Sequence, residues 1–455
     1  MGRRVPSAVT TSVTWLEVLC GVVAVSIPLT LALFITRYTV NAPFYDEFDW
    51  APLIFHSHDG TLTFGELWTQ HNDHRLFFGN LIALGLERLG GWNQLRECWT
   101  SLAVAIVGQV FLLRLLRSSF PARTAFMLLV VDSFLLFSLS QENNWIWGFQ
   151  TAWILISTCV LGLLWSLSGS PITGKRLALA AAFAIVASFS LLFGLNVWPA
   201  GFLVLVLHRP FERRLVLTWI ALAIAVLALY FYQYDFLFQG SASAANHVSV
   251  WTWPTYFFAF LGAPIGNWAG PVWSATLGVL GTIAFAVMSP ALLTGATALT
   301  RRQVCTPWLG LGAFAILCAA LTTAGRAGIG VGQALDSRYS TPATLFWIAT
   351  LSLGVLCLHS LRLRRAVRFG TIGVLVLGAA LFVCASLFGF ARMQNDYDVH
   401  LKGYYTERNV MTASDDDLRA VYPVPSQARS YLERLAKMGQ GPAATSIGGC
   451  PLPCR

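Results

Sequence analysis

The sequence predicts an all-α protein whose helices cross a membrane many times. Of its 455 residues, 56% are hydrophobic and only 11% are charged, whereas an ordinary soluble chain has about 25% charged side chains. Uncharged runs of about 20 residues, the length that crosses a bilayer as a helix, recur along the chain. Composition and run length together exclude a string of soluble domains and predict a polytopic helix bundle.

Eleven apolar runs are predicted to be membrane spans. The stretch between Arg176 and Arg209 is divided into two short spans, because Asn196-Val197-Trp198-Pro199 has the composition of a turn and because one span would place basic residues on opposite sides. Segment 236–271 is interpreted as a re-entrant or interfacial piece, and two more spans there would make thirteen. The predicted spans are 15–36, 98–116, 124–140, 149–168, 177–193, 197–208, 215–233, 272–299, 307–324, 341–360 and 370–391.

The net charge of +9 is explained by topology. With the N-terminus in the cytoplasm, the cytoplasmic segments hold about half of the 30 basic residues and a single acid, Glu212, as the positive-inside rule requires. The C-terminus then lies outside the cell membrane. No basic patch with interleaved aromatic residues is present, so a nucleic-acid partner is not expected. Membrane lipids are expected partners, because basic residues near the surface attract anionic headgroups.

Two parts are distinguished by their composition. Residues 1–391 are predicted to be the transmembrane domain, with a large first outside loop at 37–97, and residues 392–455 an extracytoplasmic tail. Within the loop, residues 76–88 are too short to span and predict a helix lying in the membrane interface. Within the tail, residues 427–438 predict an amphipathic helix that caps the outer end.

The last two cysteines, Cys450 and Cys454, are candidates for a disulfide in the outside tail.

Carboxylates directly after the first span are the main candidates for catalysis. Asp46 and Glu47 lie in the string Tyr45-Asp46-Glu47, where the first helix and neighbouring aromatic residues can hold a carboxylate at the membrane surface. Such a carboxylate can accept a proton from a substrate hydroxyl. A solvated acidic turn is the alternative.

A second polar string in the same loop contains His71, Asp73, His74 and Arg75. These side chains are expected to contact a sugar or a phosphate of the substrate. A divalent metal ion is the alternative, with Asp46, His71 and His74 as candidate ligands, because His and carboxylate groups bind such ions. The His-x-x-His spacing does not match a helical zinc motif. No other cofactor is indicated.

A short outside loop between two later spans combines amides, a carboxylate and indole rings. Glu142, Asn143, Asn144 and Trp145 suit a sugar, because polar groups satisfy its hydroxyls and an aromatic face covers its C–H side. An aromatic belt at the membrane interface is the alternative.

Two arginines near the outside surface suit a phosphate. Arg326 lies beside a Gly-rich turn, and Arg338 is followed by Tyr339 at the predicted start of a helix. A guanidinium binds two phosphate oxygens at once, whereas an arginine that snorkels to the interface is the alternative.

Asp132 lies inside the third predicted span, where an ionisable group is costly and often functional. Pairing within the bundle is favoured over a role in proton transport.

The pattern resembles the GT-C superfamily of integral-membrane glycosyltransferases that use lipid-phosphate sugars. The first helix, the large outside loop opening with Tyr45-Asp46-Glu47 and the in-plane helix at 76–88 carry the resemblance. It implies that Asp46 is the catalytic base and that Arg326 and Arg338 hold the donor phosphate.

The expected function is therefore transfer of a hexose or pentose from a polyprenyl-phosphate donor to an extracytoplasmic glycan or lipid acceptor, with inversion, in a bacterial inner membrane. An O-antigen-type polymerase or ligase is one alternative, although its large loop is expected late in the chain. A transporter or flippase for a lipid or small molecule is another, although repeats and broken helices are expected there.

Overall fold

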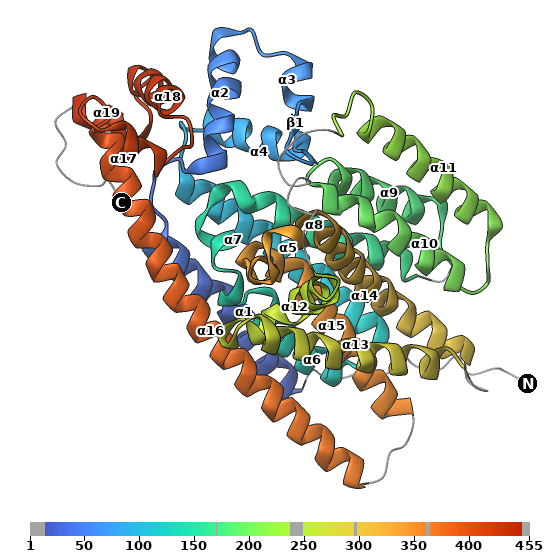
Figure 1. Cartoon of the computed structure of the whole chain (residues 1–455). Helices are drawn as coiled ribbons and strands as arrows, with labels where there is room; N and C mark the ends of the chain where they lie inside the picture. The colour runs from blue at the N-terminus through green and yellow to red at the C-terminus, as the bar shows by residue number, and fades with distance from the viewer. Residues whose placement is uncertain (1–13, 170, 237–248, 295–297, 361–364, 448–455) are drawn as a thin grey trace, which may run out of the picture.

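The computed structural model describes residues 14–169, 171–236, 249–294, 298–360 and 365–447. Within these residues the chain is helical apart from one two-stranded ladder (Figure 1). The predicted all-α class is confirmed. Cys450 and Cys454 lie outside the described residues.

Nine helical segments of the described residues are long and apolar enough to cross a membrane. Their helices are α1 (Trp15–Tyr38), α5 (Gln94–Ser119), α6 (Ala122–Leu136), α8 (Thr151–Leu167), α11 (Arg213–Tyr230), α13 (Pro271–Leu293), α14 (Ala298–Arg326), α15 (Ser337–Ser360) and α16 (Arg365–Arg408). The remaining two predicted spans are shorter helices, α9 (Gly174–Ser188) and α10 (Val197–Leu207), separated by the 3-10 turn η4 (Leu192–Asn196). The expected division into two short helices is confirmed, but the break lies before the predicted turn, because η4 ends at Asn196 and residues 197–199 already belong to α10.

Segment 236–271 contributes a single helix in its described part, α12 (Thr252–Gly266). It packs antiparallel to α13, and the two backbones approach closely at Gly262 and Gly278. A Cβ atom at either glycine would overlap a backbone carbonyl of the other helix. The absence of side chains at these two positions therefore permits the contact, as is common where helices pack in membranes.

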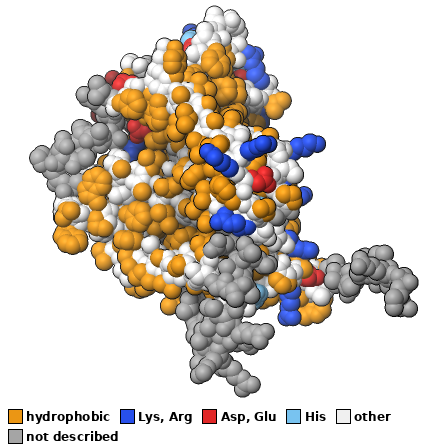
Figure 2. All heavy atoms as spheres, turned by 90° about the vertical axis from the view of Figure 1, so that its right-hand side faces the viewer, with side chains coloured by type: hydrophobic (Ala, Val, Ile, Leu, Met, Phe, Trp, Pro, Cys, Tyr) orange, Lys and Arg blue, Asp and Glu red, His pale blue; other side chains and the backbone are white. Residues whose placement is uncertain are grey.

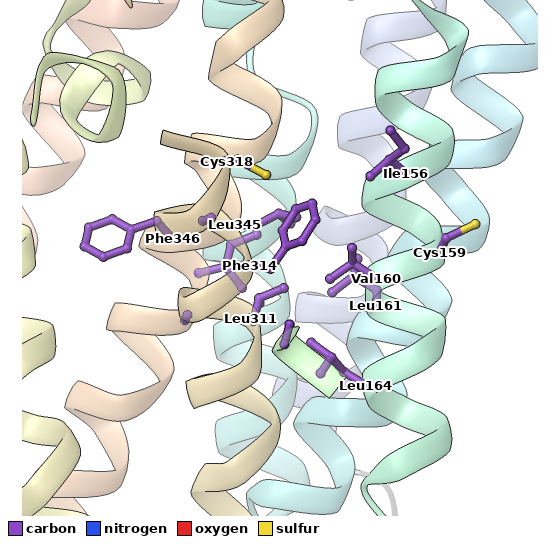
Figure 3. Packing of buried hydrophobic residues seen from close by; sticks show 14 of the residues in the cluster. Ile156, Cys159, Val160, Leu161, Leu164, Leu311, Phe314, Cys318, Leu345 and Phe346 are labelled. Atoms are coloured by element: carbon purple, nitrogen blue, oxygen red, sulfur yellow. The ribbon is translucent and has the colours of Figure 1, made fainter. Parts of the chain in front are cut away.

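The centre of the bundle is α8, which is the most enclosed of the nine membrane-length segments in the described residues, followed by those of α15 and α14. Figure 3 shows Val160, Leu161 and Leu164 of α8 opposite Leu311 and Phe314 of α14, whereas Cys159 and Phe346 point away from this contact. The labelled residues are Ile156, Cys159, Val160, Leu161, Leu164, Leu311, Phe314, Cys318, Leu345 and Phe346. By contrast, only a minority of the residues in the apolar parts of α1, α11 and α16 is buried, and hydrophobic side chains cover much of the face in Figure 2. Such a surface suits lipid tails, so the fold supports a multi-pass membrane protein.

The predicted first outside loop folds as a small helical layer. It comprises the 3-10 turn η1 (Tyr45–Asp49), α2 (Trp50–Asp59), α3 (Phe64–Trp68), strands β1 (Gln70–His71) and β2 (His74–Arg75), and α4 (Phe77–Arg88). Helix α4 coincides with the helix predicted at 76–88.

The end of the chain folds against this layer. Its helices are α17 (Asp415–Arg419), α18 (Pro425–Lys437) and α19 (Gly441–Ile447), and Figure 1 shows them beside α2 at one end of the bundle. Helix α18 matches the amphipathic helix expected at 427–438. Its Leu435 joins Trp50 and Ile54 in one buried cluster, whereas Leu432 joins Phe48 in another.

The division proposed at 391/392 falls inside a helix. Helix α16 continues without a break to Arg408, and Gly389 packs against the backbone of Leu139. The tail is therefore connected to the bundle through a continuous helix.

Candidate active site

The η1 turn holds two neighbouring carboxylates in opposite environments. Tyr45, just before them, has a φ of 47°, a left-handed conformation that is uncommon for a residue with a side chain. Its backbone N–H donates to the carbonyl of Val421, at 2.9 Å. The tail therefore helps to hold the turn in this conformation.

Glu47 faces into the protein. Its side chain is fully buried and accepts from the backbone N–H groups of Phe44 (2.8 Å) and Phe149 (3.1 Å) and from the side-chain amide of Gln94. Burial raises the pKa of Glu47 well above its usual value. Because its oxygens are engaged by neighbours, Glu47 holds the turn in shape and lacks access to a substrate.

Asp46 is half-buried and lies among charged groups. Burial raises its pKa, Asp49 adds to the increase, and His71, Arg338 and Arg326 oppose it. Asp46 thus lies within the electrostatic reach of both arginines that the sequence singled out. Of the two neighbouring acids, it alone remains accessible as a proton acceptor.

The two arginines come from the two helix ends beside this turn. Arg326 is the last residue of α14, and its Nη2 lies 3.7 Å from Asp73 Oδ2. Arg338 lies in the first turn of α15, and its Nη2 is 2.9 Å from Asp336 Oδ2. Among the described residues, the buried Nε of Arg338 has no hydrogen-bond acceptor, so this arginine keeps a donor that a bound anion could satisfy.

The Gln141–Trp145 string holds the start of α15 in place. Asn144 Nδ2 donates to the backbone carbonyl of Arg338 (3.3 Å) and to Thr341 Oγ1 (2.6 Å), which in turn donates to Gln141. Glu142 is fully buried and faces Arg392. The hydrogen bonds of Asn144 therefore hold the backbone of Arg338 at the start of α15.

Aromatic residues of the same string divide into a buried ring and a peripheral one. Trp145 is fully buried, and its indole N–H donates to the carbonyl of Ser138, so it has no face left for a sugar. Trp147, the second indole of this loop, packs near Phe44 and Phe149.

Asn143 and Tyr339, which were predicted to bind the sugar and the donor phosphate, contact other parts of the protein. The side-chain amide of Asn143 donates to Asp396 of α16 at 3.5 Å. Tyr339 is buried between the rings of Trp153, Phe193 and Phe260, so it supports the start of α15 rather than reaching toward a phosphate.

The His71–His74 string forms a tight hairpin. His71 pairs with His74 across a two-residue loop, and Asn72 takes the left-handed conformation with a φ of 50°, which asparagine tolerates better than most residues. His71 Nδ1 lies 2.9 Å from Asp49 Oδ2. The hairpin thus brings His71 to the η1 turn.

His74 and Arg75 turn toward the bundle. His74 Nδ1 accepts from the backbone N–H of Leu192, and burial, with added repulsion from His71 and the two arginines, lowers its pKa to about 3. Arg75 is almost fully buried, and it donates to the backbone carbonyls of Trp68, Tyr230 and Tyr232. Arg75 therefore joins the hairpin to the end of α11.

The proposed metal ligands do not gather in one place. The described residues contain no group of three or more His, Cys, Asp or Glu side chains that could hold a metal ion. Asp46, His71 and His74 thus do not form a three-ligand site here.

The sequence places Asp49 with Asp46 and Glu47 among the carboxylates that follow the first span, but it does not identify the partner of Asp49. Tyr422 donates to Asp49 Oδ1 at 3.1 Å. No local pattern marks Tyr422, because its contact is made across most of the chain.

Comparison with known proteins gives a likeness of fold only. No protein-family model matches the chain, and no curated protein matches it. Among solved structures, it is similar to the crystal structure of ArnT from Cupriavidus metallidurans bound to undecaprenyl phosphate, with 16% sequence identity, a TM-score of 0.48, and coverage of 92% of this chain and 76% of that one. At this identity and score, the likeness assigns neither a reaction nor a ligand to this chain.

Proposed function

We propose that the chain is a membrane glycosyltransferase that moves a hexose or pentose from a polyprenyl-phosphate donor to an extracytoplasmic glycan or lipid acceptor. The observation that carries the proposal is the placement of Asp46 together with Arg326 and Arg338 at one end of an apolar bundle. This site combines one accessible carboxylate with two guanidinium groups. It therefore offers a proton acceptor together with two cationic groups that suit a phosphate.

The donor's two chemical halves match the two environments of the site. A polyprenyl chain is apolar and suits the exposed hydrophobic side chains of the helices, whereas its phosphate needs cationic donors. Arg326 and Arg338 present such donors, and the unsatisfied Nε of Arg338 gains an acceptor when a phosphate oxygen binds.

The chemistry follows from these positions. Asp46 accepts the proton of the acceptor hydroxyl, whose oxygen forms a bond to the anomeric carbon while the bond from that carbon to the phosphate oxygen breaks. The electron pair of the broken bond goes to the phosphate, where Arg326 and Arg338 stabilise the growing negative charge. One displacement inverts the anomeric carbon.

Orientation is part of the proposal. The charge bias of the sequence places the N-terminus in the cytoplasm and residues 392–455 outside, in a bacterial inner membrane. The end carrying Asp46 then faces the extracytoplasmic side. His71 and Asp73, on the loop beside Asp46, are the residues we assign to acceptor or sugar contacts.

A transporter is the second candidate, because of Asp132. This residue is fully buried within α6, and neither of its carboxylate oxygens has a hydrogen-bond partner among the described residues. The pairing expected from the sequence is not found. An ionisable residue inside a membrane helix often marks a proton relay.

The test uses the purified full-length chain and a panel of radiolabelled polyprenyl-phosphate sugars with extracted membrane glycans and lipids as acceptors. We expect transfer or slow hydrolysis of one donor, and loss of about 100-fold or more in Asp46→Asn with donor binding retained. Asp59→Asn is the matched control, because Asp59 pairs with Arg434 away from the site. Undiminished turnover by Asp46→Asn would remove Asp46 from catalysis. Consumption of no donor, with proton-coupled uptake that depends on Asp132, would favour the transporter.

A further inference from the structure

Each of the two arginines assigned to the donor phosphate faces a carboxylate of the protein. Arg326 Nη2 lies 3.7 Å from Asp73 Oδ2. Arg338 Nη2 lies 2.9 Å from Asp336 Oδ2. All four side chains are partly exposed, and the two pairs together carry no net charge. A phosphate that enters this site therefore meets two paired cations and must compete with two carboxylates.

Asp336 is held in place by the helix start that carries its arginine. Its Oδ1 accepts from the backbone N–H of Arg338 at 3.4 Å, and α15 begins at the residue after Asp336. A carboxylate in this position satisfies a free N–H group of the first helical turn. Asp336 is therefore a fixed negative charge beside Arg338.

Asp73 is fixed by its backbone and not by its side chain. It lies in the two-residue loop between β1 and β2, and its backbone carbonyl accepts from the hydroxyls of Tyr230 (3.0 Å) and Tyr234 (3.2 Å). The carboxylate is left to face Arg326, at a distance that is longer than a hydrogen bond. The Asp73 carboxylate can therefore leave Arg326 for another position while the hairpin keeps its backbone contacts.

We propose that the donor phosphate displaces Asp73 from Arg326, and that Asp73 thereby sets the charge of the lipid phosphate that the site takes. The site accepts the single negative charge of a phosphodiester, as in a polyprenyl-phosphate sugar, and gains little affinity from any further charge. This inference rests on the proposed function and makes Asp73 a specificity residue for the donor. The displaced carboxylate is free to accept from a sugar hydroxyl, which is the contact that the proposed function assigns to Asp73.

The proposed reaction changes the charge of the lipid phosphate. A sugar phosphodiester has one negative charge, and the electron pair of the broken bond gives polyprenyl phosphate a second one as the acceptor proton moves to Asp46. Near neutral pH this second charge persists, because the second pKa of a phosphate monoester is about 6. The two arginines attract the added charge, whereas the two aspartates repel it. The product is therefore bound no more tightly than the donor, which allows polyprenyl phosphate to leave after transfer.

The charge preference is tested by equilibrium binding, without any transfer reaction. The full-length protein in detergent at pH 8 is titrated with the methyl diester of polyprenyl phosphate, with polyprenyl phosphate and with polyprenyl diphosphate, all of one chain length. We expect the parent protein to bind these lipids with Kd values within about threefold of one another. In Asp73→Asn, the Kd of polyprenyl phosphate relative to that of the methyl diester should fall about tenfold. An unchanged ratio in Asp73→Asn would contradict the role of Asp73.

Two further variants separate charge from structure. Asp73→Glu keeps the negative charge and should retain the similar Kd values of the parent protein. Asp59→Asn removes an exposed carboxylate that pairs with Arg434 away from the site, and it should also leave the Kd ratios unchanged. Asp73→Asn retains the backbone carbonyl that Tyr230 and Tyr234 contact, so its Tm in the same detergent should stay close to that of the parent protein.

The consequence for turnover is measured as product inhibition, with the radiolabelled donor that the panel identifies. Added polyprenyl phosphate competes with the donor for the same arginines. We expect the inhibition constant of polyprenyl phosphate, relative to the KM of the donor, to fall about tenfold in Asp73→Asn. Inhibition of equal strength in Asp73→Asn and in the parent protein would contradict a role of Asp73 in product release.

The possible outcomes distinguish the two proposals. Loss of transfer in Asp46→Asn with unchanged Kd ratios in Asp73→Asn would retain the glycosyltransferase and overturn the role of Asp73. The expected Kd ratios without consumption of any donor would retain a lipid-phosphate site whose charge preference Asp73 sets, and overturn the proposed function. Binding of none of the lipids would overturn both.

Discussion

Arg392 Nε lies 2.9 Å from Glu142 Oε1, and this pair joins the long helix α16 to the loop that contacts the backbone of Arg338. Arg392 Nη1 also donates to the carbonyl of Leu335, at 3.3 Å. Asn144, next but one to Glu142, donates to the backbone carbonyl of Arg338. The position of Arg338, a proposed phosphate-binding residue, thus depends on α16. The boundary that the sequence predicts between transmembrane domain and tail falls inside this helix.

The first prediction concerns the pH dependence of stability at Glu142. Burial raises the pKa of Glu142 to about 8, against the opposing effect of Arg392. Because the folded pKa lies above the unfolded value of about 4.3, the folded state binds more protons between these values, and this contribution to stability is lost as pH rises toward 8. Glu142→Gln removes the titration, so its Tm should fall less than that of the parent protein between pH 5 and pH 8, as measured by thermal unfolding in detergent. An equal fall in both proteins would contradict the assignment.

The second prediction concerns the opposite case, His74. Its folded pKa of about 3 lies below the unfolded value of about 6.5, so its contribution to stability is present above pH 6.5 and is lost as pH falls toward 3. Asn at this position keeps an acceptor for the Leu192 N–H without titrating. We expect His74→Asn to lose less Tm than the parent protein between pH 7 and pH 4. A steeper acid loss in the variant would show that His74 is charged in the folded state.

The third prediction concerns Arg326 and Arg338. Each guanidinium is expected to make a charge-assisted hydrogen bond to the donor phosphate, worth about 1.5–3 kcal/mol. Arg326→Gln and Arg338→Gln should therefore weaken donor binding by about 10- to 100-fold, and Arg338→Lys should fall between Arg and Gln because it keeps the charge and loses the fork. Equilibrium binding of labelled polyprenyl-phosphate sugar measures this. Arg434→Gln, at the distant pair with Asp59, should bind as the parent protein does.

The fourth prediction separates structure from substrate contact at Arg75. Its guanidinium donates to three backbone carbonyls at the hairpin and the end of α11, which lysine cannot reproduce. Arg75→Lys should lower the free energy of unfolding by about 2 kcal/mol, with little change in donor KM for the folded fraction. Arg88→Lys, at an exposed contact with Ser57, is the control. A raised KM without loss of stability would restore the substrate contact that the sequence suggested for Arg75.

The sequence was informative wherever a local property was sufficient. Apolar runs located the membrane-length helices, and the length of the run between Arg176 and Arg209 indicated two helices, although the break between α9 and α10 lies before the predicted turn at 196–199. The short apolar run at 76–88 and the amphipathic pattern at 427–438 each became a helix. The polar string around Asp46 was also recognised, because carboxylates directly after an apolar helix are unusual enough to stand out.

The sequence was less informative about the environment of each side chain. Asp46 and Glu47 carry the same chemical group and are neighbours in the sequence. In the structure, Asp46 is half-buried among charged groups, whereas Glu47 is enclosed by hydrogen-bond donors. The same applies to Trp145, which is buried in the bundle, and to Trp147 at the loop layer. Side chains that are neighbours in the sequence point in different directions. Contacts with remote segments decide which of them faces the candidate active site.

Sequence alone therefore determined that this chain is a bundle of apolar helices with polar and charged residues between the apolar runs, because hydrophobicity and charge are properties of each residue. Tertiary structure alone decided that Asp46 stays accessible while Glu47 is enclosed, and that Tyr422 reaches Asp49. The physical reason is that the left-handed turn at Tyr45 is held by a hydrogen bond to Val421. That contact exists only after the chain's end has folded back onto its beginning.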